Sequence, residues 1–230
     1  MEQKTNVSMS SIILEPGVGS SYGNGWRQLW KYFLELFLIL IISWVLGIPG
    51  SLISWLGGPN PVASLFVFIY TLLVLWPVGY GVSFAYLRAA RGDGLEIKDV
   101  FAAFKNYWNA VLANLLVTII IVIGLFLVII PGIFFACKLA FTPYLVVDRK
   151  MDVIEAVRTS WRMTGGHGWK VFLIGLLGIP IFIVGLICFG IGAIISVMWI
   201  SMALASLYHA VSTSAGVPES SGAAIQGPSA

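Results

Sequence analysis

The sequence contains little charge and few of the residues that form disulfides or hold metals. Charged residues are only 10% of the 230, and hydrophobic residues are 59%. A typical soluble domain has about 25% charged residues. The chain has only two cysteines and two histidines, which argues against a disulfide framework or a His/Cys metal cluster. These shortages exclude an ordinary soluble domain and indicate a chain built for lipid.

The missing charge leaves long uncharged stretches. Lys, Arg, Asp and Glu are absent from 36–87 and from 171–218, and only Lys138 interrupts 106–147. A bilayer core about 30 Å thick needs about 20 apolar residues in a helix. Gly/Pro-rich turn sequences divide each stretch near its middle. The sequence therefore predicts an all-α, polytopic membrane helix bundle with about six transmembrane helices in three hairpins.

The Pro131-Gly132 pair decides how the middle stretch is divided. A straight helix over 109–147 would be about 60 Å long, about twice the hydrocarbon thickness. Proline removes a backbone donor and glycine tolerates turn conformations, so we expect a tight reversal between two spans. A re-entrant pair and a tilted, kinked helix are the alternatives. Pro143 and Asp148 predict the end of the fourth span.

Lysine and arginine are distributed unevenly between the connections. Basic residues precede the first span at 27–31, follow the second at 88–105 and follow the fourth at 149–170. The three opposite connections carry neither Lys nor Arg. Because cytoplasmic loops are enriched in these residues, both the N- and the C-terminus are predicted to be cytoplasmic.

The two ends of the chain differ in composition from the spans between them. Residues 1–25 and 213–230 are polar or rich in Gly, Ser and Pro, which is typical of disordered tails. The N-terminal residues are too weakly apolar for a cleavable signal peptide. The predicted organisation is a six-helix transmembrane domain at 26–212 between two cytoplasmic tails.

Two cytoplasmic segments, near 95–108 and 152–164, have the periodicity of short amphipathic helices. Asp152 and Glu155 resemble a capping box at the start of the second segment. Both segments fit helices in the inner headgroup region with basic side chains near anionic lipid. Connector helices packed under the bundle would show the same pattern. The predicted interfacial anchors are Trp30, Trp108, Trp161, Trp169, Arg158 and Arg162.

The stretch "PGIFFACKLAFTPYLVVDRKMDVIEAVRTSWRMTGGHGWKVF" resembles a family of bacterial integral membrane proteins. These are the YciC-like proteins and the related glycerophosphoryl diester phosphodiesterase membrane domain, and the likeness extends over 62–208. The shared pattern is a Pro-Gly-Ile break, an aromatic-rich span, a Pro-to-Asp exit and an Ala-x-x-x-Ser-Trp helix closed by Gly. The matching residues are Pro131, Gly132, Ile133, Pro143, Asp148, Ala156, Ser160, Trp161 and Gly165.

This resemblance implies a multi-pass protein of the bacterial cytoplasmic (inner) membrane whose molecular activity is uncharacterised. The hydrolase activity in the second family name belongs to a separate soluble barrel. The chain has no room for such a barrel and lacks the acidic and histidine residues that a metal-dependent phosphodiesterase requires. The enzyme activity is therefore not carried over to this chain.

Intramembrane charge is the remaining functional lead, because such residues are costly and often functional. Glu35 lies four residues after Lys31, and Lys138 lies near the predicted middle of the fourth span. Side chains lean toward the N-terminus of their own helix, so Lys138 and Glu35 lean apart and a direct bridge is not expected. Lys138 could instead meet helix-end carbonyls or water, snorkel outward, or contact an anion or lipid headgroup.

No catalytic, metal-binding or cofactor-binding constellation is visible, so the prediction is a protein that is not an enzyme. Its expected role is in membrane or lipid organisation. Its partners are the lipid bilayer, anionic inner-leaflet headgroups and possible homo-oligomer or membrane-protein contacts, without nucleic acid. The alternative is a small transporter or channel subunit that works as an oligomer, which Pro-broken helices and Lys138 favour. A membrane enzyme acting on lipids is the third hypothesis.

Overall fold

The computed structural model describes residues 15–58, 60–127, 129–187 and 191–214. These residues form helices and connecting turns, with no strand among them. In chain order the helices are α1 (Val18–Lys31), α2 (Phe33–Gly57), α3 (Pro61–Tyr70), η1 (Thr71–Leu75), α4 (Trp76–Arg91), η2 (Ile97–Asn106), α5 (Tyr107–Leu127), α6 (Ile129–Leu139), α7 (Thr142–Asp148), α8 (Val153–Met163), α9 (Gly168–Ile187) and α10 (Ile191–Ser214).

Within these ranges, six helical stretches are long and apolar enough to cross a membrane. This confirms the predicted all-α class and the six spans, and it indicates a multi-pass membrane protein. The stretches are Phe33–Gly57, Pro61–Arg91, Ile97–Phe126, Pro131–Asp148, Gly168–Ile187 and Gly192–Ser214.

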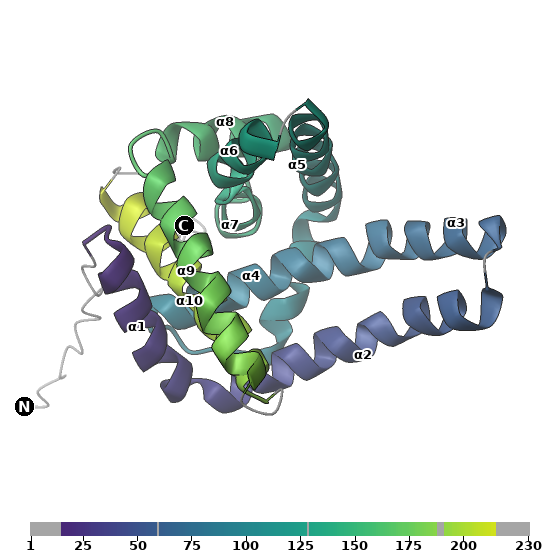
Figure 1. Cartoon of the computed structure of the whole chain (residues 1–230), viewed down its shortest axis with the longest axis horizontal. Helices are drawn as coiled ribbons and strands as arrows, with labels where there is room; N and C mark the ends of the chain where they lie inside the picture. Colours follow the sequence, from purple (N-terminus) through teal and green to yellow (C-terminus); the bar gives the residue numbers. More distant parts are fainter. Residues whose placement is uncertain (1–14, 59, 128, 188–190, 215–230) are drawn as a thin grey trace, which may run out of the picture.

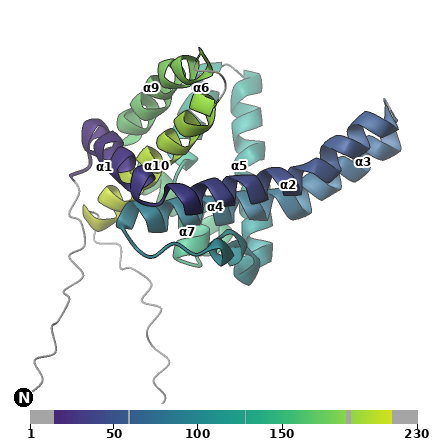
Figure 2. The ribbon, with the colours of Figure 1, turned by 90° about the horizontal axis from the view of Figure 1, so that it is seen from below.

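Helix α10 is the most buried of the six stretches and lies along α1, α4 and α9 (Figures 1 and 2). Its inward side chains, Met202, Leu207 and Tyr208, are fully buried. They belong to one large apolar cluster that also includes Leu87 of α4 and Phe141, which precedes α7. The core is therefore built around the end of the fourth stretch and the last helix of the described chain.

Helix α1 corrects the predicted N-terminal boundary, because it begins at Val18 within the stretch expected to be a disordered tail. It packs chiefly on α10, where the Tyr22 ring meets the Trp199 ring edge-on with 5.5 Å between centroids. Asn24, which is 1% exposed, donates hydrogen bonds to the carbonyl of Ala90 and to the hydroxyl of Ser206, both at 3.0 Å. Polar side chains with distant partners thus order a segment that looks like a tail.

Helices α2 and α3 lie side by side and extend away from the rest of the molecule (Figures 1 and 2). The Tyr70 hydroxyl of α3 donates to the carbonyl of Leu46 at 2.7 Å. Leu46 lies three residues before Pro49, which lies inside α2 and removes a backbone donor there. The carbonyl that loses its donor to the proline is that of Val45, four residues earlier, so the Tyr70 bond to the next carbonyl is an additional tie between α3 and α2.

The second long stretch joins α3 and α4 through η1, a five-residue π-helix. A π-helical turn widens the backbone and disturbs the regular ladder of hydrogen bonds. The Tyr107 hydroxyl, at the start of α5, donates to the carbonyl of Leu73 inside η1 at 2.9 Å. This contact ties the second stretch to the third at the widened turn.

The η2 segment, predicted as an amphipathic helix, is a ten-residue 3-10 helix that packs against α4. A β-carbon added to Gly81 of α4 would lie 1.7 Å from the carbonyl oxygen of Val100. Only glycine permits this approach. Arg88 of α4 also forms an ion pair at 2.7 Å with Asp99, whose carboxylate caps the start of η2 by accepting from the backbone of Glu96.

The chain reverses between the end of α5 at Leu127 and the start of α6 at Ile129, so Pro131 and Gly132 lie in the first turn of α6. The predicted turn position is therefore shifted by a few residues. The pair instead permits close packing, because a β-carbon on Gly132 would lie 2.8 Å from the backbone nitrogen of Leu125.

The fourth stretch is not one continuous helix. Helix α6 ends at Leu139, and α7 begins at Thr142 with Pro143 in its first turn. Proline at this position lacks the backbone donor that would continue the ladder. Pro143 therefore marks a break inside the stretch, while Asp148 is the last residue of α7.

Candidate functional site

Two features combine charge with burial, and the first is an ionic junction between the ends of α4 and α7. Arg91 donates from both terminal nitrogens to the two carboxylate oxygens of Asp148, at 2.7 and 2.8 Å. The side chains are only 12% and 8% exposed. A bidentate guanidinium–carboxylate pair has the geometry of the strongest protein hydrogen bonds, so this pair holds the two helix ends in register.

Further groups surround the Asp148 carboxylate. One carboxylate oxygen, Oδ2, accepts from Arg91 and also from the Nε of Arg149 at 3.2 Å; the Arg149 side chain is 2% exposed. The Tyr208 hydroxyl of α10 lies 3.4 Å from the same oxygen, and the Tyr208 ring stacks on that of Tyr144. Two guanidiniums and one carboxylate give these three charged groups a net charge of +1. This junction connects three helices and has a structural character, because its carboxylate is already fully engaged.

The second feature is the contact of α8 with the end of α6. Ser160 and Thr164 donate from their hydroxyls to the backbone carbonyl of Lys138 at 2.9 and 3.1 Å. The last carbonyls of a helix need partners from outside the helix. The Trp161 ring packs against those of Phe134 and Phe135, with centroids 5.9 and 5.8 Å apart. The Ser-Trp pair of the family-like pattern thus caps and covers α6.

The Lys138 ammonium lies against two aromatic rings. It is 5.5 Å from the centroid of Phe134, one turn earlier on α6, and 5.4 Å from that of Trp161. The contact with Phe134 agrees with the expected lean toward the start of the helix. Among the residues that the structure describes, no carboxylate lies within ion-pair distance of Lys138.

Lys138 lies beside the 164–168 turn that precedes α9. It is also next to the break between α6, which ends at Leu139, and α7, which begins at Thr142. Its position near the middle of the fourth span stays a prediction.

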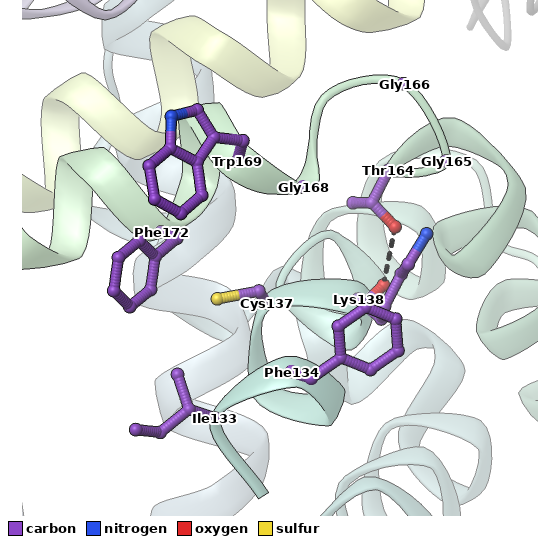
Figure 3. Close-up of a pocket in the computed structure, with 10 residues that line it drawn as sticks. All are labelled: Ile133, Phe134, Cys137, Lys138, Thr164, Gly165, Gly166, Gly168, Trp169 and Phe172. Atoms are coloured by element: carbon purple, nitrogen blue, oxygen red, sulfur yellow. Dashed lines mark hydrogen bonds between the residues drawn. The ribbon is translucent and has the colours of Figure 1, made fainter. Parts of the chain in front are cut away.

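A cavity of about 470 Å³ lies between α6, the 164–168 turn and the start of α9 (Figure 3). Its walls are mainly apolar and aromatic, and Lys138 lies at the edge formed with Thr164 and Gly165. The volume is within the range of about 300–1,000 Å³ that is usual for small-molecule sites. The wall residues are Ile133, Phe134, Cys137, Trp169 and Phe172.

The two amphipathic segments are docked on the bundle and also expose apolar side chains. Segment η2 buries Asp99, Val100 and Ala103, and α8 buries Ala156, Thr159, Ser160 and Met163. Val100 is buried against α4, while the rings of Phe101 and Phe104 are exposed. The predicted anchors are all exposed: Trp30, Trp108, Trp161, Trp169, Arg158 and Arg162.

The predicted side-chain cap of α8 is not formed, and Glu35 lies apart from Lys138, as expected. The Asp152 side chain does not cap α8 and instead accepts a hydrogen bond from the Asn109 amide at 2.9 Å. Glu35 lies in the first turn of α2, and the structure does not bring it near Lys138, since α2 and α6 share no substantial packing. The Lys31 ammonium lies over the Tyr32 ring at 4.9 Å.

Comparison with known proteins adds no assignment to this geometry. No protein-family model matches the chain, and no solved structure matches it. Over the described ranges, no group of three or more His, Cys, Asp and Glu side chains is arranged to hold a metal ion.

The Arg91–Asp148 junction is the feature that sequence reasoning missed. Arg91 entered only as one of several basic residues, and Asp148 only as the end of a span. Each of the two residues follows a long apolar run and ends a helix. Two opposite charges at such helix ends were the sequence signal that could have indicated an ion pair. The partnership itself joins residues that are 57 positions apart.

Proposed function

We propose that this protein is a non-enzymatic, multi-pass membrane protein that organises anionic lipid at one face of the bilayer. The observation that carries the proposal is the exposure on η2 and α8. Phe101, Phe104 and Ile154 are between 41% and 56% exposed, although both segments are fixed to the bundle by buried faces. Rigid apolar side chains beside basic ones suit the boundary between headgroups and acyl chains.

Basic side chains accompany this apolar surface. Lys98 and Lys105 are exposed on η2, and Arg158 and Arg162 are exposed on α8. Near an anionic membrane surface, each Lys or Arg contributes about 1 kcal/mol of attraction. The proposed orientation places this face and both termini in the cytoplasm, with the spans as three hairpins in the bacterial inner membrane. The charge asymmetry of the connections supports that orientation.

The test is a neutralised variant that carries Lys98→Gln, Lys105→Gln, Arg158→Gln and Arg162→Gln. It is reconstituted into nanodiscs with equal amounts of phosphatidylglycerol and phosphatidylcholine. We expect the natural sequence to retain an excess of phosphatidylglycerol after dilution into detergent, and the variant to lose most of that excess. A matched control exchanges Lys and Arg at the same positions and should keep it. Equal retention by all three proteins would contradict the proposal.

The broken fourth stretch favours a second candidate, a small transporter or channel subunit acting as an oligomer. Discontinuous helices commonly form substrate sites in transporters, and here the break after Leu139 lies next to Lys138. Ion flux into vesicles containing the protein, followed with a potential-sensitive dye, tests this. Flux above that of empty vesicles supports transport, and flux equal to theirs contradicts it.

A further inference from the structure

We infer that the cavity beside Lys138 binds a single anionic lipid, with its phosphate at the lysine and one acyl chain along the wall between α6 and α9. This inference rests on the proposed function in one respect, which is the side of the membrane from which the lipid comes. It differs in naming one cavity as the site and one class of ligand. It also rests on a cavity and a cation that lie apart from the exposed faces of η2 and α8.

The first step is the charge of Lys138. A lysine among apolar side chains in a membrane protein is costly unless it finds compensating charge, dipoles or water. The rings of Phe134 and Trp161 cover part of the ammonium, at 5.5 and 5.4 Å. The structure supplies no carboxylate to it within the described ranges. Lys138 also lines the cavity, with its ammonium at the rim beside Thr164 and Gly165 (Figure 3), so an anion at this rim would meet the charge.

The second step is the chemistry of the wall. Apart from Lys138 and the 164–168 turn, the cavity is lined by aliphatic, aromatic and thiol side chains. Inorganic phosphate would leave this apolar wall without a partner. An anionic lipid fits both the lysine and the apolar wall, because its phosphate pairs with the ammonium while a hydrocarbon chain lies on Phe172 and Ile133.

The third step is access. Phe134 and Trp169, which line the cavity, are 51% and 68% exposed, so the cavity is open at the surface of the bundle. Within a bilayer that surface faces lipid, and a chain can enter sideways. The neighbouring turn precedes α9, whose first residues Trp169 and Lys170 are of the kind found at membrane interfaces. The phosphate would therefore lie at headgroup depth.

Cys137 provides a direct reporter, because its thiol lies in the wall (Figure 3). In a Cys188→Ser background, the rate of Cys137 modification by a maleimide is measured in uncharged maltoside micelles. The additions are dodecyl phosphate, dodecanol or inorganic phosphate. We expect dodecyl phosphate to slow labelling about tenfold, as expected for a site about nine-tenths occupied. Dodecanol and inorganic phosphate should have little effect.

The matched variants decide the role of the charge. Lys138→Met should abolish the protection by dodecyl phosphate, while Lys138→Arg should retain it. Lys150→Met, which removes an exposed lysine outside the cavity, should also retain it. Protection that persists in Lys138→Met overturns the inference, as does equal protection by inorganic phosphate or dodecanol. If Lys138→Met does not fold, Lys138→Gln serves in its place.

Failure here is distinguishable from failure of the proposed function. The variant neutralised on η2 and α8 keeps Lys138, so it should keep Cys137 protection while losing the excess of phosphatidylglycerol. Lys138→Met should show the opposite pattern, with the lipid excess largely kept. A loss of Cys137 protection in the neutralised variant would mean that the cavity is not a separate site.

Discussion

Replacing Asp148 by asparagine should destabilise the protein more than any other single change at the junction of α4, α7 and α10. The change keeps the shape of the side chain and removes its charge, so that the guanidiniums of Arg91 and Arg149 face a neutral amide. Their side chains are only 12% and 2% exposed. Breaking a buried ion pair by removing one partner costs about 3–5 kcal/mol, and we expect Asp148→Asn to fall in this range.

The opposite change should cost less. Arg91→Gln leaves the Asp148 carboxylate with Arg149 at 3.2 Å and the Tyr208 hydroxyl at 3.4 Å. The remaining penalty is the loss of two hydrogen bonds to one group, which we place at about 1–3 kcal/mol. The ranking follows from the bonds that are disturbed, because Asp148→Asn weakens those of both guanidiniums and Arg91→Gln removes those of one.

The free energy of unfolding is measured by titrating SDS into mixed micelles and following tryptophan fluorescence. The exposed pair Lys98–Glu96 is the control, since its side chains are 75% and 53% exposed. Glu96→Gln should change stability little, because exposed ion pairs contribute little to stability. If Asp148→Asn costs no more than Arg91→Gln, the Asp148 carboxylate is not the group that holds both guanidiniums, and this reasoning is refuted.

Three further predictions use the same titration. Gly81→Ala should cost several kcal/mol, because the new β-carbon would lie 1.7 Å from the Val100 carbonyl oxygen. Gly79→Ala on the same helix is the control, since its β-carbon would have no atom within 4 Å, and it should be neutral or slightly stabilising. The double change Ser160→Ala with Thr164→Val should cost about 1–3 kcal/mol by leaving the Lys138 carbonyl without hydroxyl donors; an unchanged stability would show that these hydroxyls do not cap α6. Asn24→Ala should cost about 1–3 kcal/mol through its two buried hydrogen bonds, and a neutral result would show that α1 is held by its apolar face alone.

The parts of the fold that were predictable from the sequence are those set by local composition. Six spans follow from the length of the apolar runs and from the turn residues between them. The amphipathic segment at α8 was found because its charged and apolar residues alternate at helical spacing. Such signals need no knowledge of which helices become neighbours.

The parts that were missed depend on distant partners. Helix α1 has the composition of a tail, and it is ordered by the contacts of Tyr22 and Asn24 with helices much later in the chain. The cavity is formed by residues from two separate segments, so local periodicity does not reveal it.

The docking of α1 on α10 has a consequence for biosynthesis. The surface that receives α1 includes Trp199 and Ala203, which leave the ribosome after nearly all the rest of the described chain. Until then, α1 lacks its main packing surface, although Asn24 can already donate to Ala90 of α4 and Tyr22 to Ile174 of α9. A product truncated before α10 would therefore have an α1 that is not docked. Proteases would then cut such a product near its N-terminus, although the missing part is at its C-terminus.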